Sequence, residues 1–374
     1  QMLDLFLGER TLFEGMCRSI CENKAAGLYD GAYKKDPFSF YYYIVNGEAV
    51  VHRYVTGAYV QIPKAVVAGG SEYPVSYIGC SAFMRADGDQ AYGLYGLRYT
   101  RYDLETVEIP SSVKDVMTDA FRGSTLRTVY DMGAVERIWD GAFGGCSSLS
   151  GVQYPDTLLF VGDGAFRGCS SKTFAKVNLP DGLRALGKAA FYGCSNVTGV
   201  RLGKTLATIP DDCFSFCSAL GSITIPDSVR SIGDNAFYNC SSLLYMDLNN
   251  VETVGRAAFS SPGSAPLLEC VVFGENLASL GAGAFSNSAA LAEIEAYCAR
   301  PDSMDEAFPG VDLQSIDYYV MSEHYDTWKS HYESVELLDE VVEEKKDNTM
   351  AYVSVGLLVF FVIAGIASFR YRMK

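Results

Sequence analysis

The sequence has few of the residues on which enzyme active sites most often depend. It contains only three histidines, His52, His324 and His331, and none lies at a metal-ligand spacing from a cysteine or beside a serine or cysteine nucleophile motif. Glycine-rich phrases are common, but they lack the Lys-Ser or Lys-Thr pair of a P-loop. We therefore expect no catalytic residue, no metal site and no cofactor, and we expect these phrases to form turns.

Positive charge is scarce as well. Lys and Arg together number 30, against 45 Asp and Glu, and the net charge is −15 at pH 7. No part of the chain carries the basic stripe that is typical of a nucleic-acid-binding surface. The sequence therefore predicts partners other than nucleic acid.

What the chain does contain is a phrase that returns about every 23 residues. Its phenylalanine occurs at Phe121, Phe143, Phe166, Phe191, Phe214, Phe237, Phe259, Phe285 and Phe308. A fixed period of about 20–30 residues is typical of a solenoid, in which each coil buries its apolar residues against its neighbours. We therefore expect one solenoid without an internal domain break, with the repeated Phe side chains in its core.

A second phrase runs with the same period and predicts strands. In Val107-Glu108-Ile109-Pro110 and Ile223-Thr224-Ile225-Pro226, two apolar residues flank a variable one and Pro follows. This alternation is typical of a short strand, and Val152-Gln153-Tyr154 is expected to form another. Stacked in register, the strands would form a parallel sheet along one side. On the return arm, we expect Gly to permit a tight turn and Ala to let the coils approach.

These residues carry a specific resemblance. Residues 220–240 read Leu-Gly-Ser-Ile-Thr-Ile-Pro-Asp-Ser-Val-Arg-Ser-Ile-Gly-Asp-Asn-Ala-Phe-Tyr-Asn-Cys, and this pattern is similar to the BspA-like class of leucine-rich repeats. The resemblance covers roughly residues 40–320. Residues 40–51 resemble the first hairpin of such domains, and residues 318–329 resemble their closing segment. Because the family is common on bacterial surfaces and on those of some protists, the resemblance implies a binding or adhesion ectodomain.

The expected domain organisation has five parts. They are an N-terminal helical segment or cap (1–35), the leucine-rich repeat solenoid (36–320), a closing segment with an acidic juxtamembrane stalk (321–349), a transmembrane helix (350–369) and a short cytoplasmic tail (370–374).

The membrane prediction rests on an uncharged stretch rich in Val, Leu, Ile, Phe and Ala. Residues 350–369 number 20, and a helix of this length spans about 30 Å, the thickness of a bilayer core. Arg370, Arg372 and Lys374 follow, and a basic flank favours the cytoplasmic side. The chain begins with Gln, for which a cleaved secretory signal is the simplest account. We therefore expect a single-pass membrane protein with extracellular or lumenal repeats; a tail-anchored cytosolic protein is the rival.

Five of the eleven cysteines follow the repeated Phe by three residues. They are Cys146, Cys169, Cys194, Cys217 and Cys240. Metal or redox chemistry is one interpretation, but their periodicity favours a ladder of small buried thiols without disulfides. Cys213 replaces the Ala of the repeat. The sequence leaves the disulfide state of five others open, namely Cys17, Cys21, Cys80, Cys270 and Cys298.

If the solenoid binds a partner, the variable middle residues of the strands should form the binding face. In chain order they are Glu108, Tyr130, Gln153, Asn178, Arg201, Thr224, Asp247, Val272 and Glu295. Within this column, the candidate partner-binding face comprises Tyr130, Gln153, Asn178, Arg201, Thr224 and Asp247, together with Tyr245 as an aromatic anchor. A solvated face without a ligand is the alternative. Asn196 and Asn239 lie in glycosylation sequons.

Two classes of function follow. The first is a membrane-anchored, non-catalytic surface protein for recognition or adhesion, which binds a protein or glycan ligand on a surface. The second is a structural or scaffold subunit that packs against neighbouring subunits of a larger membrane-associated complex or surface assembly.

Overall fold

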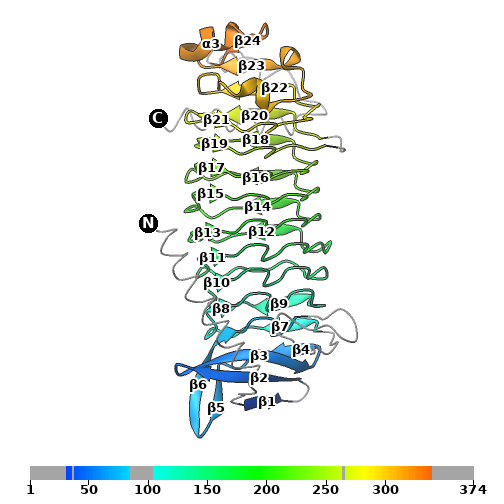
Figure 1. Ribbon diagram of the computed structural model, residues 1–374, viewed down its shortest axis with the longest axis vertical. Helices are drawn as coiled ribbons and strands as arrows, with labels where there is room; N and C mark the ends of the chain where they lie inside the picture. Colours follow the sequence, from blue (N-terminus) through cyan, green and yellow to red (C-terminus); the bar gives the residue numbers. More distant parts are fainter. Residues whose placement is uncertain (1–30, 36–37, 85–103, 263–265, 339–374) are drawn as a thin grey trace, which may run out of the picture.

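The computed structural model describes residues 31–35, 38–84, 104–262 and 266–338. Within these ranges the chain winds into a column of stacked coils, with the N-terminal strands at one end and short helices at the other (Figure 1). The predicted repeat solenoid is thus confirmed. None of the helices in this part of the chain has the length and apolar character needed to cross a membrane. The predicted transmembrane helix at 350–369 and the tail at 370–374 lie outside the described residues.

One side of the column carries the strands that the sequence predicts, which pair in parallel with their neighbours in several runs. They are β4 (Tyr59–Gln61), β7 (Thr106–Glu108), β9 (Thr128–Asp131), β12 (Lys176–Asn178), β14 (Gly199–Arg201), β16 (Ser222–Thr224), β18 (Tyr245–Asp247), β20 (Cys270–Phe273), β22 (Glu293–Ala296), β23 (Asp317–Val320) and β24 (Val335–Leu337). We call this side the front sheet.

The prediction of a strand at Val152-Gln153-Tyr154 is wrong, because these residues form no strand and no ladder pairing. Tyr154 takes the inward position that Ile109 or Leu179 fills in other coils, and its ring packs edge-on against Phe166 at 5.6 Å. The pairing of the front sheet is interrupted at this coil, between β9 and β12.

A second column of strands, which the sequence analysis missed, lies along another side of the solenoid (Figure 1). Apart from β6 at its start, its strands are two residues long. They are β6 (Ser71–Ile78), β8 (Asp115–Val116), β10 (Arg137–Ile138), β11 (Phe160–Val161), β13 (Ala185–Leu186), β15 (Thr208–Ile209), β17 (Ser231–Ile232), β19 (Thr253–Val254) and β21 (Ser279–Leu280). Alternation over two residues gives no period to detect, so only the stacking of coils reveals these strands.

The N-terminal end is closed by antiparallel pairs. β2 (Phe38–Val45) and β3 (Glu48–Thr56) form the expected first hairpin, and β5 (Ala65–Ala68) pairs with β6. β1 (Gly31–Lys35) pairs with β2, so the prediction of a helical segment through residue 35 is wrong for its last five residues. An edge of β2 left free by β3 offers unpaired backbone groups, which β1 satisfies. Residues 1–30 lie outside the described part.

The C-terminal end extends past the predicted boundary of the solenoid at residue 320. It comprises α2 (Met304–Ala307), η1 (Leu313–Ser315), η2 (Ser322–His324), α3 (Tyr325–Lys329) and the last strands of the front sheet. Trp328 of α3 is fully buried and donates its indole N–H to the carbonyl of Cys298 at 3.1 Å. β24 pairs with β23, so residues 335–337 belong to the sheet rather than to a stalk. The remainder of the predicted stalk lies outside the described residues.

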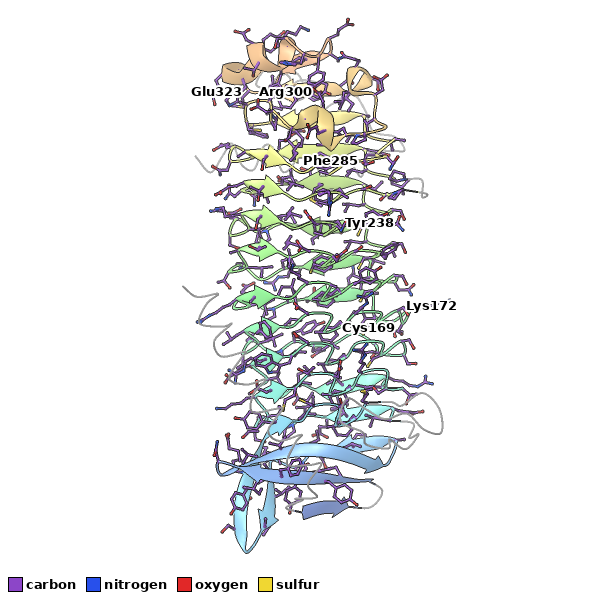
Figure 2. The ribbon with its side chains drawn as sticks, in the orientation of Figure 1. Cys169, Lys172, Tyr238, Phe285, Arg300 and Glu323 are labelled. Atoms are coloured by element: carbon purple, nitrogen blue, oxygen red, sulfur yellow. The ribbon has the colours of Figure 1, made fainter. Side chains whose placement is uncertain are left out.

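The core is an unbroken stack of phenylalanine rings. From Phe83 to Phe308 each repeat Phe lies nearly parallel to the next, with ring centroids 4.8–5.5 Å apart. The spacing follows from that of neighbouring strands, which sets the rise of each coil. The side chains form corresponding layers along the column, with Phe285 among them (Figure 2). The predicted buried Phe core is confirmed.

The predicted cysteine ladder is also confirmed, and its thiols are hydrogen-bonded. Cys169 donates its Sγ–H to the carbonyl of Phe143, and Cys194 does the same to Phe166, at 3.3 and 3.2 Å. Cys146, Cys217 and Cys240 make the same contact with the preceding coil. Seven of the described cysteines are free thiols, namely Cys146, Cys169, Cys194, Cys213, Cys217, Cys240 and Cys298; Cys17 and Cys21 lie outside the described residues. Because burial disfavours the thiolate, the pKa of Cys217 rises to about 12, which makes it a poor nucleophile.

Glycine after the strands of the second column has a role other than the turn that was predicted. A Cβ at Gly187 would lie 2.3 Å from the backbone N of Asp163, in the coil below. Gly233 has the same relation to Asp211, at 2.5 Å. Close approach between successive backbones, not a left-handed conformation, therefore requires glycine at this position.

Candidate recognition surface

The middle residues of the front sheet are exposed over the centre of the column. Tyr130, Gln153, Asn178, Arg201 and Thr224 all present their side chains to solvent, as predicted. Their inward neighbours, such as Val177 and Val200, are buried. The result is a column of chemically varied side chains on a rigid frame. Arg201 also contacts Asp181 through an ion pair, and Asp181 pairs with Lys204 at 2.8 Å.

The C-terminal part of this face differs from the prediction. Tyr245 and Asp247 are only half-exposed, and Val272 and Glu295 are buried, with 3% and 6% of their surface exposed. All four residues of β20 are buried. Burial raises the pKa of Tyr245, and the nearby Asp247 and Glu295 raise it further, so its phenol stays neutral. The face of varied, exposed side chains therefore ends near β16.

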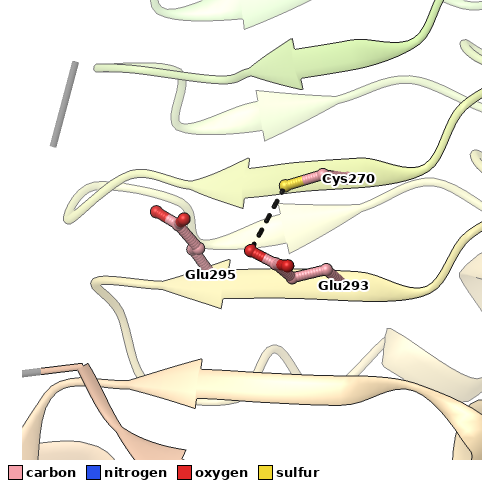
Figure 3. Close-up of side chains that lie close together, drawn as sticks. All are labelled: Cys270, Glu293 and Glu295. Carbon is pink, nitrogen blue, oxygen red and sulfur yellow. Dashed lines mark hydrogen bonds between the residues drawn. The ribbon is translucent and has the colours of Figure 1, made fainter. Parts of the chain in front are cut away.

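Strand register brings three potential ligands together in this covered region. Cys270 lies opposite Glu293 on the neighbouring strand, and Glu295 follows on the same side of β22 (Figure 3). The Cys270 Sγ lies 4.0 Å from Glu293 Oε1, and the ligand atoms of all three residues lie within 4.8 Å of one another. Among the described residues, this is the group whose donors could hold a metal ion. This group was not predicted from the sequence, because Cys270 and Glu293 are 23 residues apart; the repeat period was the available signal.

At the N-terminal end of the front sheet the surface is hollowed. A pocket of about 290 Å³ is lined by residues of β4, β7 and β9 and of the turns that follow β4 and β7. Gln61, Glu108 and Asp131 lie in one row across the three strands. Glu108 Oε2 accepts hydrogen bonds from Tyr59 Oη at 2.7 Å and from Gln61 Nε2 at 3.1 Å. From the sequence, Glu108 is expected on this face and Tyr59 belongs to an N-terminal concentration of tyrosines that indicates a partner surface, but neither the pocket nor Gln61 was predicted.

A second surface feature is an aromatic stripe, formed by residues that follow the repeat Phe in three turns. Tyr192, Phe216 and Tyr238 come from three successive coils, with ring centroids 5.3 and 5.5 Å apart. The guanidinium of Arg167 lies 4.2 Å from the ring centre of Tyr192. Phe216 has φ +61°, a conformation that Gly168 and Gly193 adopt at the same repeat position. A bulky side chain in this region is strained and marks the stripe as unusual.

The two sequon asparagines, Asn196 and Asn239, are both half-exposed. The Asn196 side chain donates to the carbonyl of Ser170 at 2.7 Å, and Asn239 precedes the buried Cys240. Their glycosylation stays a prediction.

The repeat geometry and the sequence pattern define a family. The model of the BspA type leucine-rich repeat region, in six copies, matches residues 99–175 and 170–292, which together make up more than half of the chain. The protein therefore belongs to the BspA-type leucine-rich repeat family. A search of curated protein sequences finds no significant match.

Solved structures with a similar fold are bacterial leucine-rich repeat proteins. One from Bacteroides ovatus is 21% identical, with a TM-score of 0.50, and the match covers 79% of this chain and 80% of that one. The leucine-rich repeat protein of T. pallidum is also 21% identical, with a TM-score of 0.45 and coverage of 75% and 97%. At this level of identity the likeness concerns the fold.

Proposed function

We propose that this protein is a non-catalytic recognition protein that binds a protein or glycan partner through the front sheet. The observation that carries the proposal is the run of exposed, chemically varied residues from Tyr130 to Thr224 on an otherwise repetitive frame. A solenoid offers an extended and rigid binding surface, because each coil is fixed by both neighbours. Membership of the BspA-type leucine-rich repeat family supports a role in protein–protein recognition.

Photo-cross-linking in the native cell tests this function. A photoreactive phenylalanine analogue at Thr224, on the front sheet, should cross-link a partner. The same analogue at Thr208, in the same coil but exposed on the second column, is the matched control and should give no such product. Equal products from both positions, or none from Thr224, Asn178 and Gln153, would refute binding at the front sheet.

We also propose a location for the protein. The repeats lie outside the cell or in a lumen, residues 350–369 anchor the chain in the membrane, and the basic residues in 370–374 lie in the cytoplasm. The uncharged composition of this stretch and the charges that follow it support the proposal.

Protease added to intact cells should remove the repeats and leave a small, membrane-protected C-terminal fragment. Detection with antibodies against each end of the chain distinguishes the two products. Repeats that are digested only after the plasma membrane is permeabilised, with a lumenal marker still protected, would place them in the cytosol instead.

A scaffold function is the second candidate, and the aromatic stripe favours it. Phe216 exposes 38% of its surface between two tyrosines, on a side other than the front sheet. Such a stripe suits lateral packing against another subunit. Cross-links from position 216 to a second copy of the chain or to a constant neighbour, without products from Thr224, would favour the scaffold over recognition.

A further inference from the structure

The pocket at the N-terminal end of the front sheet has a built set of polar groups. Across β4, β7 and β9, Gln61 lies opposite Glu108, and Glu108 lies opposite Asp131. Each carboxylate is held in place: Glu108 accepts from Tyr59 and Gln61, and Asp131 accepts from the backbone N–H of Gly133 at 2.8 Å. Their orientation is therefore fixed before any ligand arrives, which reduces the entropy cost of binding.

A β-bulge places an aromatic ring beside this row. Val107 lies opposite Val129, but Glu108 lies opposite Asp131, so Tyr130 is the extra residue of β9. Bulges redirect side chains and are frequent at binding sites. Tyr130 exposes 75% of its surface and Tyr59 exposes 43%, and both are among the few large apolar side chains exposed in the described residues. The two phenols lie close enough for Tyr130 to contribute to the raised pKa of Tyr59, whose main cause is the hydrogen bond to Glu108.

The turn after β9, beside the pocket, depends on glycine. Gly133 has φ +56°, and a Cβ there would lie 2.4 Å from the carbonyl oxygen of Pro110, one of the lining residues. The backbone N of Ile109 also donates to the carbonyl of Asp131 at 3.1 Å. The wall between β7 and β9 is therefore fixed by the fold, as expected for a preformed site.

The polar lining mixes donors and acceptors. Glu108 and Asp131 only accept when ionised, Lys64 only donates, and Gln61 and Ser111 can do both. Vicinal hydroxyl groups require this combination, because each hydroxyl donates one hydrogen bond and accepts others. The electron-rich faces of Tyr130 and Tyr59 attract polarised C–H groups of a saturated ring. Two carboxylates oppose an anionic ligand, and Lys64 offsets one of their two charges.

We propose that this pocket binds one uncharged sugar unit, such as the terminal residue of a surface glycan. The inference rests on the recognition function proposed above and names its ligand class. A volume of about 290 Å³ lies at the lower end for small-molecule pockets and suits a single ring rather than a chain. Glu108 and Asp131 accept from ring hydroxyls, and Gln61 and Lys64 donate to them. Tyr130 is not in the lining; it precedes Asp131 in the chain and would pack against the part of the apolar face that projects from the pocket.

Saturation-transfer NMR on the full chain tests the proposal directly. The probes are the methyl glycosides of glucose, galactose and N-acetylglucosamine, with N-acetylneuraminic acid and the tripeptides Gly-Arg-Gly and Gly-Lys-Gly as contrasts. We expect ring-proton signals from at least one neutral glycoside. Tyr130→Ala and Glu108→Ala should each weaken its binding about tenfold, the scale for loss of one good contact.

Three further variants keep the test decisive. Thr208→Ala, exposed on the second column and outside the front sheet, should bind as the parent does. Tyr130→Phe keeps the ring and should retain most of the affinity. Glu108→Gln keeps the size of the side chain and removes its charge, so it should still weaken binding if Glu108→Ala fails to fold.

The outcomes separate the ligand class from the proposed function. No signal from any neutral glycoside, equal binding by all variants, or stronger signals from the charged probes would overturn the sugar site. If cross-linking from Thr224 persists in that case, the recognition function stands with a different ligand. If the glycosides and the cross-links both fail, the proposed function falls as well.

Discussion

Replacing Phe191 with alanine is expected to lower the free energy of unfolding by about 3–5 kcal/mol, the usual cost of removing a buried aromatic ring. Phe191 is fully buried and lies between Phe166 and Phe214, with centroids at 5.3 and 5.5 Å and rings within 5° of parallel. The variant loses both stacking contacts and leaves a cavity between two coils. Because each coil is stabilised through its neighbours, one gap weakens the whole column.

Denaturant unfolding monitored by circular dichroism measures this effect. Phe216→Ala is the matched control, since it removes the same ring from an exposed position and leaves the core stack intact. The free energy of unfolding of Phe216→Ala should fall by only about 1 kcal/mol, the scale of the contacts of Phe216 with Tyr192 and Tyr238. Equal midpoints for Phe191→Ala and the parent would contradict a continuous aromatic core.

Replacing Asp115 with alanine should cost about 3 kcal/mol, because it removes a fully buried carboxylate and takes this acceptor away from Arg137 and Trp139. Asp115 is fully buried at the start of β8. Its Oδ1 accepts from Arg137 Nε at 2.5 Å and from Trp139 Nε1 at 2.8 Å, and its Oδ2 accepts from Arg137 Nη2 at 2.9 Å. The substitution therefore removes the acceptor of three hydrogen bonds across two coils.

Asp181→Ala provides the comparison for this variant. Asp181 is exposed and pairs with Arg201 and Lys204, and surface ion pairs contribute only about 0–1 kcal/mol. Thermal melting at low and high salt should show a large loss for Asp115→Ala that salt does not change. A melting temperature for Asp115→Ala close to that of Asp181→Ala would mean that the buried pair adds no net stability.

The candidate surface could be predicted only in part. The variable position of each strand phrase correctly predicts exposure at Asn178, Arg201 and Thr224, because alternation in a strand sends successive side chains to opposite faces. The same pattern fails at Val272 and Glu295, which are buried. Strand periodicity says which side a residue faces, and not what covers that side.

The sequence by itself determined the solenoid, the aromatic stack and the unpaired thiols, since each recurs with the period of the coil. Only the tertiary structure decided three other features. The two-residue strands of the second column are too short to have a period. Glycine is required at position 187 because the backbone of Asp163, 24 residues earlier and in the coil below, lies too close for a side chain. The row of Gln61, Glu108 and Asp131 depends on the register of three strands and on the bulge at Tyr130. Contacts between residues far apart in the chain arise from stacking, and no local pattern encodes them.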